Sequence, residues 1–124
     1  MTLESSVPPI LADKRYGDGS AFRPENLLRE ARRQKGLADR QAPRVCVLDP
    51  DGDLVRRLKT EGRARPDPAW ACYHTELHRF DHEGREFGVV GCAVGAAFAV
   101  LVAEQLFASG CELLLSLTSA GRLA

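Results

Sequence analysis

The pattern of hydrophobic and polar positions is clearest between Gly84 and Leu123, where it predicts a strand, a helix and a second strand. Residues 87–92 form a short apolar run rich in β-branched side chains, which is typical of a buried strand. From Ala96 apolar residues recur at helical spacing, and Gly110 is expected to end this helix. Residues 113–117 are mostly leucine, which predicts a parallel strand covered by helices on both faces. The segment is therefore expected to form a βαβ crossover.

The helix of this crossover is expected to turn one apolar face toward the sheet. That face would consist of Ala97, Val100, Leu101, Phe107 and Ala108, with Glu104 as an exception. Ligands of open α/β sheets bind beyond the carboxyl ends of the strands. Residues 91–98 and 118–122 follow the two strands of the crossover, so we expect a small-molecule site there.

The rest of the chain predicts an arm followed by one domain. Residues 1–22 contain Pro8 and Pro9 and show little periodicity, which favours an extended arm. Residues 23–124 are expected to form a single α/β domain, because a chain of 124 residues is large enough for one core. Before the crossover we expect, in order, a helix from Pro24 to Gly36, a strand over 44–48, a helix over 54–60, and a hairpin of strands 70–80 and 85–90.

Composition and charge narrow the class of protein. Seventeen basic and seventeen acidic residues cancel, and a hydrophobic fraction of 44% is ordinary for a globular chain. The arginines of the first helix alternate with acids, which favours a solvated face over a nucleic-acid interface. The stretch 87–103 contains no charged residue, which raises the question of a membrane span. Its three glycines and the polar residues Glu104 and Gln105 that follow it argue against one. We therefore expect neither a nucleic acid nor a membrane as partner.

The four cysteines are spaced too widely to indicate a metal site or a disulfide framework. None forms a Cys-x-x-Cys pair, and most lie in apolar, strand-like surroundings; they are Cys46, Cys72, Cys92 and Cys111. We expect reduced, buried thiols in a cytoplasmic protein, because free thiols persist in a reducing compartment. The first thirty residues are polar and of mixed charge, unlike a signal peptide.

Two groups of potential metal ligands have simpler interpretations. Asp49, Asp51 and Asp53 resemble the start of a calcium loop, but apolar and basic residues follow where further oxygen ligands are needed. Capping of the next helix by Asp51 or Asp53 is therefore favoured. The three histidines recur every four residues, and on the expected hairpin His74 and His78 share a face. We expect structural or exposed histidines and no metal site.

Several short motifs follow one another in a specific order. They are the loop Asp49-Pro50-Asp51-Gly52-Asp53, the turn Glu83-Gly84, the segment Val90-Gly91-Cys92-Ala93-Val94-Gly95, the helical Ala103-Glu104-Gln105-Leu106, Gly110, and the loop Thr118-Ser119-Ala120-Gly121. Over residues 43–124 this order resembles the amino-terminal half of the purine and uridine phosphorylase family. The resemblance implies a three-layer α/β/α fold with a mixed central sheet, apparently truncated here. It also implies exchange of a nucleobase for phosphate at the ribose anomeric carbon, or hydrolysis at the same bond.

The resemblance further implies where phosphate and nucleoside would bind. The implied phosphate-binding residues are Gly52, Arg56, Ser119 and Arg122, and the implied substrate loops contain Gly91, Gly95, Thr118 and Gly121. Two arginines of the family pattern are replaced, because one falls on Val55 and the strand-end arginine falls on Ser116. The arginine that a neighbouring subunit lends to the site falls near Tyr73 or His74, with Arg79 as the nearest substitute. Catalytic residues are not assigned, no cofactor is expected, and phosphate is the possible co-substrate.

Three functions remain open from the sequence. The first is cleavage of the N-glycosidic bond of a purine or pyrimidine nucleoside, by a pentosyltransferase or a nucleosidase. The second is a non-catalytic, truncated relative that acts as a ligand-binding or oligomer-dependent module. The third is a generic nucleotide-binding βαβ unit, which rests on Gly91, Gly95 and the helix start at Ala96. An uncovered strand edge at 113–117 would pair with another copy, so we expect a homo-oligomer.

Overall fold

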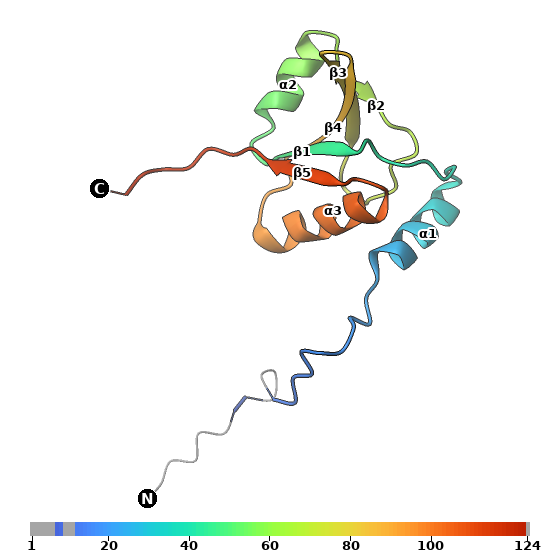
Figure 1. The fold of residues 1–124 in the computed structure, drawn as a ribbon, viewed down its shortest axis with the longest axis vertical. Coiled ribbons are helices and arrows are strands. Elements are labelled where there is room, and N and C mark those ends of the chain that lie inside the picture. Colours follow the sequence, from blue (N-terminus) through green and yellow to red (C-terminus); the bar gives the residue numbers. More distant parts are fainter. Residues whose placement is uncertain (1–6, 9–11, 124) are drawn as a thin grey trace, which may run out of the picture.

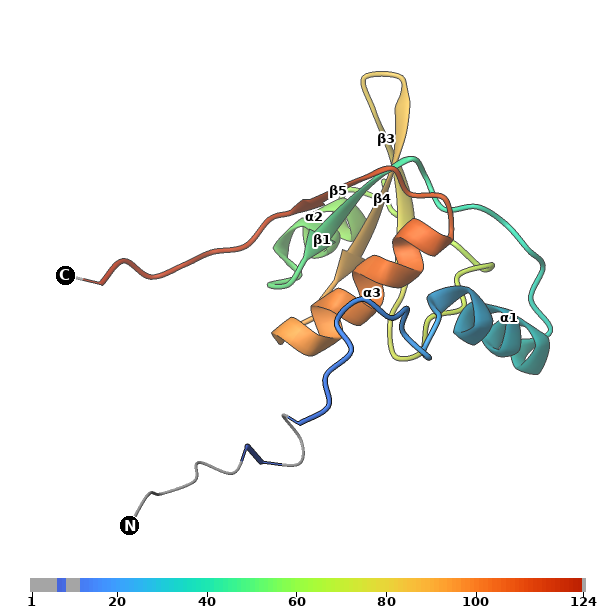
Figure 2. The ribbon, with the colours of Figure 1, turned by 60° about the horizontal axis from the view of Figure 1, so that its bottom comes forward.

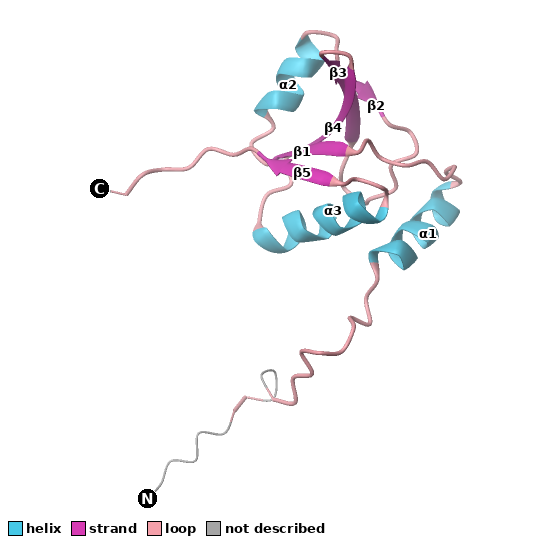
Figure 3. Ribbon diagram, viewed as in Figure 1, coloured by secondary structure: helices cyan, strands magenta, loops and turns pink. Residues whose placement is uncertain are grey.

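The computed structural model describes residues 7–8 and 12–123, which fold around one mixed sheet with helices on both faces. Figure 1 traces the chain, and Figure 3 separates its helices from its strands. The elements are α1 (Pro24–Lys35), β1 (Val45–Asp49), α2 (Asp53–Thr60), β2 (Arg65–Pro66), β3 (Leu77–His82), β4 (Arg85–Gly91), α3 (Ala96–Ala108) and β5 (Leu113–Ser116). The predicted α/β class is confirmed, with five strands and three helices among the described residues.

The sheet is built around β1, in the strand order β2-β3-β4-β1-β5. Val47 of β1 lies opposite Val89 of β4 on one side and Leu115 of β5 on the other, and both pairings are parallel. The chain leaves β4, passes through α3 and returns as β5 on the far side of β1, which confirms the predicted crossover. β3 and β4 form the predicted antiparallel hairpin, with Glu83 and Gly84 in its turn.

Each face of the sheet has its own hydrophobic core. On one face α3 packs against the central strands, in a cluster that includes Cys46, Leu48, Val90, Val102 and Leu106. On the other face α2 packs in a cluster of Val47, Val55, Leu58, Phe80 and Val89. Figure 2 shows α3 in front of the sheet, α2 behind it, and α1 beside α3. The alternation of side chains along β1 and β4 thus supplies both cores at once.

α1 begins and ends where the sequence predicts. Pro24 occupies the first turn, where its missing N–H costs no intrahelical hydrogen bond. Gly36 ends the helix in the left-handed conformation with a φ of 64°, and its N–H donates to backbone carbonyls of the last turn. Leu28 and Ala31 are its buried residues, and they pack beside Ala108 at the end of α3.

The predicted inward face of α3 is wrong. The buried residues are Val102, Gln105 and Leu106, whereas Val100 and Phe107 are 57% and 50% exposed. Apolar side chains surround this helix on nearly every side, so their spacing did not define which face meets the sheet. Leu106, which is fully buried, marks the face that contacts β1 and β4.

The prediction that residues 113–117 are covered on both faces is also wrong. Among the described residues β5 is an edge strand that pairs with β1 alone, and Leu113, Leu115 and Leu117 are exposed. Leu114 alone of this run packs against the α3 core. A run of leucines indicates an apolar strand, but it carries no information about how many neighbours the strand has. β5 therefore leaves one edge of the sheet uncovered by the described residues, which is the condition under which the sequence favoured self-association.

The first strand of the hairpin starts later than expected. Residues 70–76 precede β3 and form turns and irregular loop, so His74 and His78 do not share a strand face. His74 has a φ of 61°, which is outside the strand region. Trp70 donates a hydrogen bond from Nε1 to Thr75 Oγ1 at 2.8 Å, and this side-chain contact helps fix the loop. The alternating pattern in 70–76 is therefore not that of a strand.

The expected arm lies partly outside the described residues, which omit 1–6 and 9–11. Residues 12–23 contain neither helix nor strand, and Figure 1 shows them running away from the sheet. Within 7–8 and 12–123, no helix has the length and apolar character needed to cross a bilayer.

Candidate functional site

The carboxyl ends of three adjacent parallel strands meet at one edge of the sheet. Asp49 at the end of β1 lies opposite Gly91 at the end of β4, and Leu48 lies opposite Ser116 at the end of β5. Residues 50–52, 92–95 and 117–122 follow these strands as loops, and they contain most of the residues that the sequence assigned to a site. The structure thus brings Gly52, Gly91 and Ser119 to the same edge from separate parts of the chain.

Asp49 ties two of these loops together. Its side chain is buried, and its Oδ2 accepts a hydrogen bond from the backbone N–H of Val55 at 3.0 Å. Its backbone oxygen accepts the N–H groups of Gly52 at 3.0 Å and Cys92 at 2.9 Å. The predicted capping of α2 by Asp51 or Asp53 is wrong, because the cap position is Gly52, which has no side chain, and the buried Asp49 satisfies the helix N–H instead.

Glycines allow the same two loops to approach each other closely. Gly52 has a φ of 76°, and a Cβ placed on it would lie 2.7 Å from Cys92 Sγ. A Cβ on Gly91 would lie 2.9 Å from Cγ2 of Val55. Both distances are shorter than van der Waals contact, so a side chain at position 52 requires the Cys92 thiol to turn away, and a side chain at position 91 requires Val55 to move.

We expect Gly52→Ala to destabilise the protein more than the matched variant Gly62→Ala. Both positions have positive φ, which costs an alanine about 1–2 kcal/mol. Only Gly52 adds a steric clash, and because the clashing atom is the exposed Cys92 thiol, its variant should lose about 1 kcal/mol more. Urea unfolding of both variants measures this difference, and adding Cys92→Ala to Gly52→Ala should remove it. Equal losses in the two single variants would show that the Cys92 thiol does not restrict the space at position 52.

Asp51 holds the loop that follows β5. Its Oδ2 accepts a hydrogen bond from the Ser119 backbone N–H at 2.9 Å and another from the Ser119 hydroxyl at 3.0 Å. These hydrogen bonds, from the backbone first and the side chain second, lower the pKa of Asp51. A carboxylate of this chain therefore occupies the donors of Ser119 that the resemblance assigned to phosphate.

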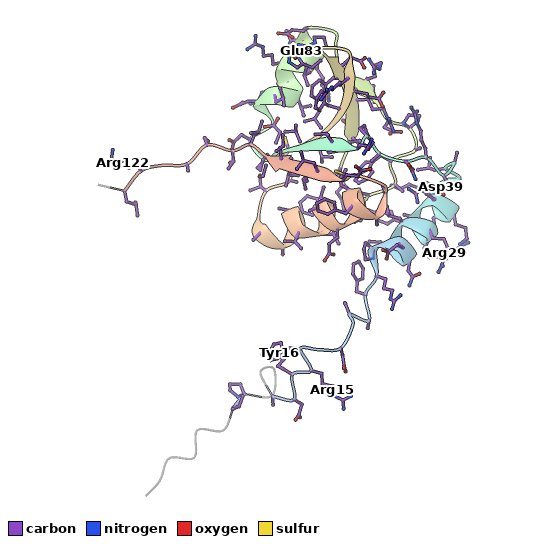
Figure 4. All side chains as sticks on the ribbon, in the orientation of Figure 1. Arg15, Tyr16, Arg29, Asp39, Glu83 and Arg122 are labelled. Atoms are coloured by element: carbon purple, nitrogen blue, oxygen red, sulfur yellow. The ribbon has the colours of Figure 1, made fainter. Side chains whose placement is uncertain are left out.

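The arginines considered for phosphate binding have other partners or lie away from this edge. Arg56 forms an ion pair with Asp53 at the start of α2. Figure 4 shows Arg122 in the extended C-terminal segment, far from the sheet. Arg79 is buried, and its Nε lies 2.7 Å from Oδ2 of Asp67, which is also buried. The suggestion that Arg79 could be lent to a neighbouring subunit is wrong, because this side chain is enclosed in its own domain.

The remaining predicted loop residues surround the same edge. Gly95 precedes α3 with a φ of 96°, and a Cβ there would meet no atom within 4 Å. Thr118 and Gly121 lie in the exposed segment after β5. The space beside Gly95 is therefore open to a ligand, whereas the space beside Gly52 and Gly91 is filled by neighbouring side chains.

A cavity of about 500 Å³ lies next to these loops, between the end of β4, α2 and the segment that precedes β3. Its polar and reactive lining includes Lys35, Lys59, His74, Glu76, His78 and Cys92. Most of these residues were absent from the predicted site. The sequence signal that could have identified them is the close spacing of His74, Glu76 and His78. These residues line the cavity because residues 70–76 form an irregular loop rather than a strand.

His78 is the most enclosed polar side chain of this cavity. It is 4% exposed, its Nδ1 has no hydrogen-bond partner among the described residues, and its Nε2 lies 3.7 Å from Glu76 Oε2. Burial lowers the pKa of His78, the nearby Lys59 cation lowers it further, and Glu76 opposes both effects. The imidazole is therefore held neutral beside a lysine.

The cysteines divide into three buried side chains and one exposed side chain at this site. All four thiols are free, and only Cys92 is exposed. Burial raises the pKa of Cys46 and of Cys72, so the thiol form is favoured at both positions. The described part of the chain holds no group of three or more His, Cys, Asp or Glu side chains that could bind a metal ion. Comparisons with protein-family models, with curated proteins and with solved structures find no match to this chain.

Proposed function

We propose that this chain binds a nucleoside at the carboxyl ends of β1, β4 and β5 and acts on its N-glycosidic bond. The observation that carries the proposal is the meeting of three glycine-bearing or hydroxyl-bearing loops at this edge, which is where open α/β sheets bind small ligands. On this proposal the chain is a divergent relative of the purine and uridine phosphorylases, with their three-layer fold. The order of the motifs over residues 43–124 supports that relationship.

The proposed acceptor of the sugar is water rather than phosphate. Asp51 carries a negative charge within hydrogen-bond distance of Ser119, and its lowered pKa keeps it ionised at neutral pH. A phosphate ion at the same hydroxyl would have to displace this carboxylate and would be repelled by it. Ser116 stands where the family pattern has an arginine, and a serine hydroxyl supplies no compensating charge.

Base release from inosine and from uridine, followed by chromatography, tests the proposal. We expect the wild-type chain to release base at similar rates in phosphate-free buffer and in phosphate buffer, because water is the acceptor. Base release that requires phosphate would contradict the choice of acceptor. Absence of both nucleoside binding and base release would contradict the nucleoside proposal itself.

We expect Asp51→Asn to gain affinity for inorganic phosphate by about tenfold, because a like charge next to the Ser119 hydroxyl is removed. Glu83→Gln is the matched control, since Glu83 is an exposed acid in the turn between β3 and β4. Its phosphate affinity should remain that of the wild type. Isothermal titration with phosphate measures both variants. An equal gain in the two would show that general charge, and not the Asp51–Ser119 contact, excludes the ion.

A non-catalytic binding module is the second candidate. It is favoured by the positions of the arginines, because Arg56 pairs with Asp53, Arg79 pairs with Asp67, and Arg122 lies away from the strand ends. On this alternative a nucleoside binds but no base is released under either buffer condition. The exposed leucines of β5 support a homo-oligomer on either proposal, because an apolar edge strand pairs readily with a second copy.

A further inference from the structure

The side chain of His78 forms no hydrogen bond to the described residues, and its Nδ1 is buried. Its side chain is 4% exposed, and no described residue forms a hydrogen bond with Nδ1. The closest acidic oxygen to Nε2 is that of Glu76 at 3.7 Å, which is longer than a hydrogen bond. Nδ1 is enclosed by the protein, so a ligand in the cavity would meet the imidazole at Nε2, which lies beside Glu76 and forms no hydrogen bond to a described residue.

The charges around His78 determine which polar group fits. Lys59 reaches the cavity from α2 and lies 3.4 Å from Glu76, and both side chains are at least half exposed. Lys35 reaches it from α1, where its Nζ donates a hydrogen bond to the Ala71 carbonyl at 2.8 Å. Glu76 is the acidic residue of this lining, so two lysines exceed it by one positive charge. A negatively charged ligand therefore restores the balance of charge.

We propose that this cavity binds a small anionic group, a phosphate or a carboxylate, between His78 and Lys59. The anion accepts a hydrogen bond from the imidazole and a second from the Lys59 ammonium, which gives up its exposed partner Glu76. Charge-assisted hydrogen bonds of this kind are among the strongest in proteins. The cavity borders the proposed nucleoside site at Gly91 and Cys92 but does not use the Ser119 loop, so failure of the anion proposal would leave the nucleoside proposal standing.

Binding of the anion is coupled to a proton. The groups that face the cavity are Lys59 on α2, Lys35 on α1, His74, Glu76 and Cys72 before β3, and Cys92 after β4. In the free protein the His78 imidazole is neutral, whereas an adjacent anion favours the imidazolium and raises its pKa. Affinity for the anion therefore rises as the pH falls through the pKa of the anion-bound state, and becomes constant below the pKa of the free state.

The test is a pH titration of the histidine side chains by NMR, using the full chain with and without sulfate. Sulfate keeps a constant charge over this pH range, so any proton uptake belongs to the protein. We expect sulfate to raise the pKa of His78, and Lys59→Met to weaken sulfate binding by at least about tenfold. Lys59 is half exposed, so this variant should keep its fold, and urea unfolding confirms that it does.

Two matched variants complete the experiment. Lys14→Met removes a lysine from the exposed arm, and His82→Gln removes an exposed histidine, so neither should change sulfate affinity. His78→Gln should abolish the pH dependence. Acetate and inorganic phosphate in parallel titrations distinguish a carboxylate from a phosphate ligand. An unchanged His78 pKa, or a sulfate effect that is equal in the wild type and Lys59→Met, would overturn the proposal and indicate an adventitious ion only.

Discussion

Replacing Arg79 with methionine should lower the free energy of unfolding by about 3–5 kcal/mol. The Arg79 side chain is 8% exposed and that of Asp67 is 3% exposed, and the pair is joined at 2.7 Å. Arg79 also donates hydrogen bonds to Glu86 and to the Gln41 carbonyl. Although burial alone would lower the pKa of Arg79, the bonds to Asp67 and Glu86 outweigh it and raise the pKa. Methionine preserves much of the volume but leaves a buried carboxylate without its counter-charge.

The Arg79→Met variant should also change the structure of the cavity wall, because Asp67 holds the segment that forms it. Asp67 Oδ1 accepts the Ala69 N–H at 3.0 Å, and the Asp67 N–H donates to the Leu77 carbonyl at 2.8 Å. The segment from 67 to 76 carries His74 and Glu76 into the cavity lining. We therefore expect Arg79→Met to disturb this loop as well as the global stability.

Arg65→Met is the matched control for Arg79→Met. Arg65 lies opposite Arg79 in the sheet and also pairs with acids, here Asp81 and Glu86, but its side chain is 53% exposed. Solvent screens such pairs, so the loss should be much smaller than that of Arg79→Met. Urea unfolding of both variants at neutral pH measures the two losses. Similar losses would contradict the distinction between a buried and an exposed arginine.

Leu106→Ala should destabilise the protein by about 2–5 kcal/mol, whereas Phe107→Ala should cost less than about 1 kcal/mol. Leu106 is fully buried between α3 and the sheet, and its truncation leaves a cavity in the larger core. Phe107 follows it directly and is 50% exposed, so its truncation removes few contacts. The two residues are neighbours in α3, and both are large apolar side chains replaced by alanine. The comparison therefore reports mainly the difference in burial.

Urea or thermal unfolding of the Leu106 and Phe107 variants decides between two orientations of α3. The spacing of apolar residues predicted Phe107 on the inner face, and the structure places Leu106 there. A larger loss for Phe107→Ala would mean that α3 is rotated relative to the sheet, or that a second copy covers Phe107. Measuring the variants at several protein concentrations separates these explanations, because only the second depends on concentration.

Local signals in the sequence predicted the boundaries of most elements well. Pro24 and Gly36 delimit α1 because a missing N–H suits a helix start and a left-handed residue suits its end. The apolar run around Val89 and Val90 became a strand in which both of these residues are fully buried, and the turn at Glu83 joined it to its antiparallel partner. These features depend on the conformational preferences of a few residues, which neighbouring elements did not override.

Features that depend on the whole fold were not predictable in the same way. Residues 70–76 alternate as a strand would, yet the Trp70–Thr75 contact and the positive φ of His74 produce a loop. The leucines of β5 gave no indication that this strand would lie at the edge of the sheet. The loop is fixed by one specific side-chain contact and the edge position of β5 by strands distant in sequence, so hydrophobic periodicity indicates neither of them.

The candidate site was predicted in part. The position of the loops after the strands followed from the crossover, and the structure brings Gly52, Gly91 and Ser119 together there. The role of Asp49 was missed, because its burial depends on the ends of β1 and β4 meeting. The cavity around His78 was missed for a related reason, since its walls come from α1, α2 and the segment before β3.

The most direct test of the proposed nucleoside site is a map of backbone amide shifts as inosine or uridine is titrated into the full chain. Our account predicts that the shifted amides cluster in residues 50–52, 92–95 and 117–121, at the carboxyl ends of β1, β4 and β5. Asp49 and its hydrogen-bonded neighbours should respond next, because they join two of these loops. Saturable shifts confined to another surface, or no shifts with either nucleoside, would contradict the proposed site.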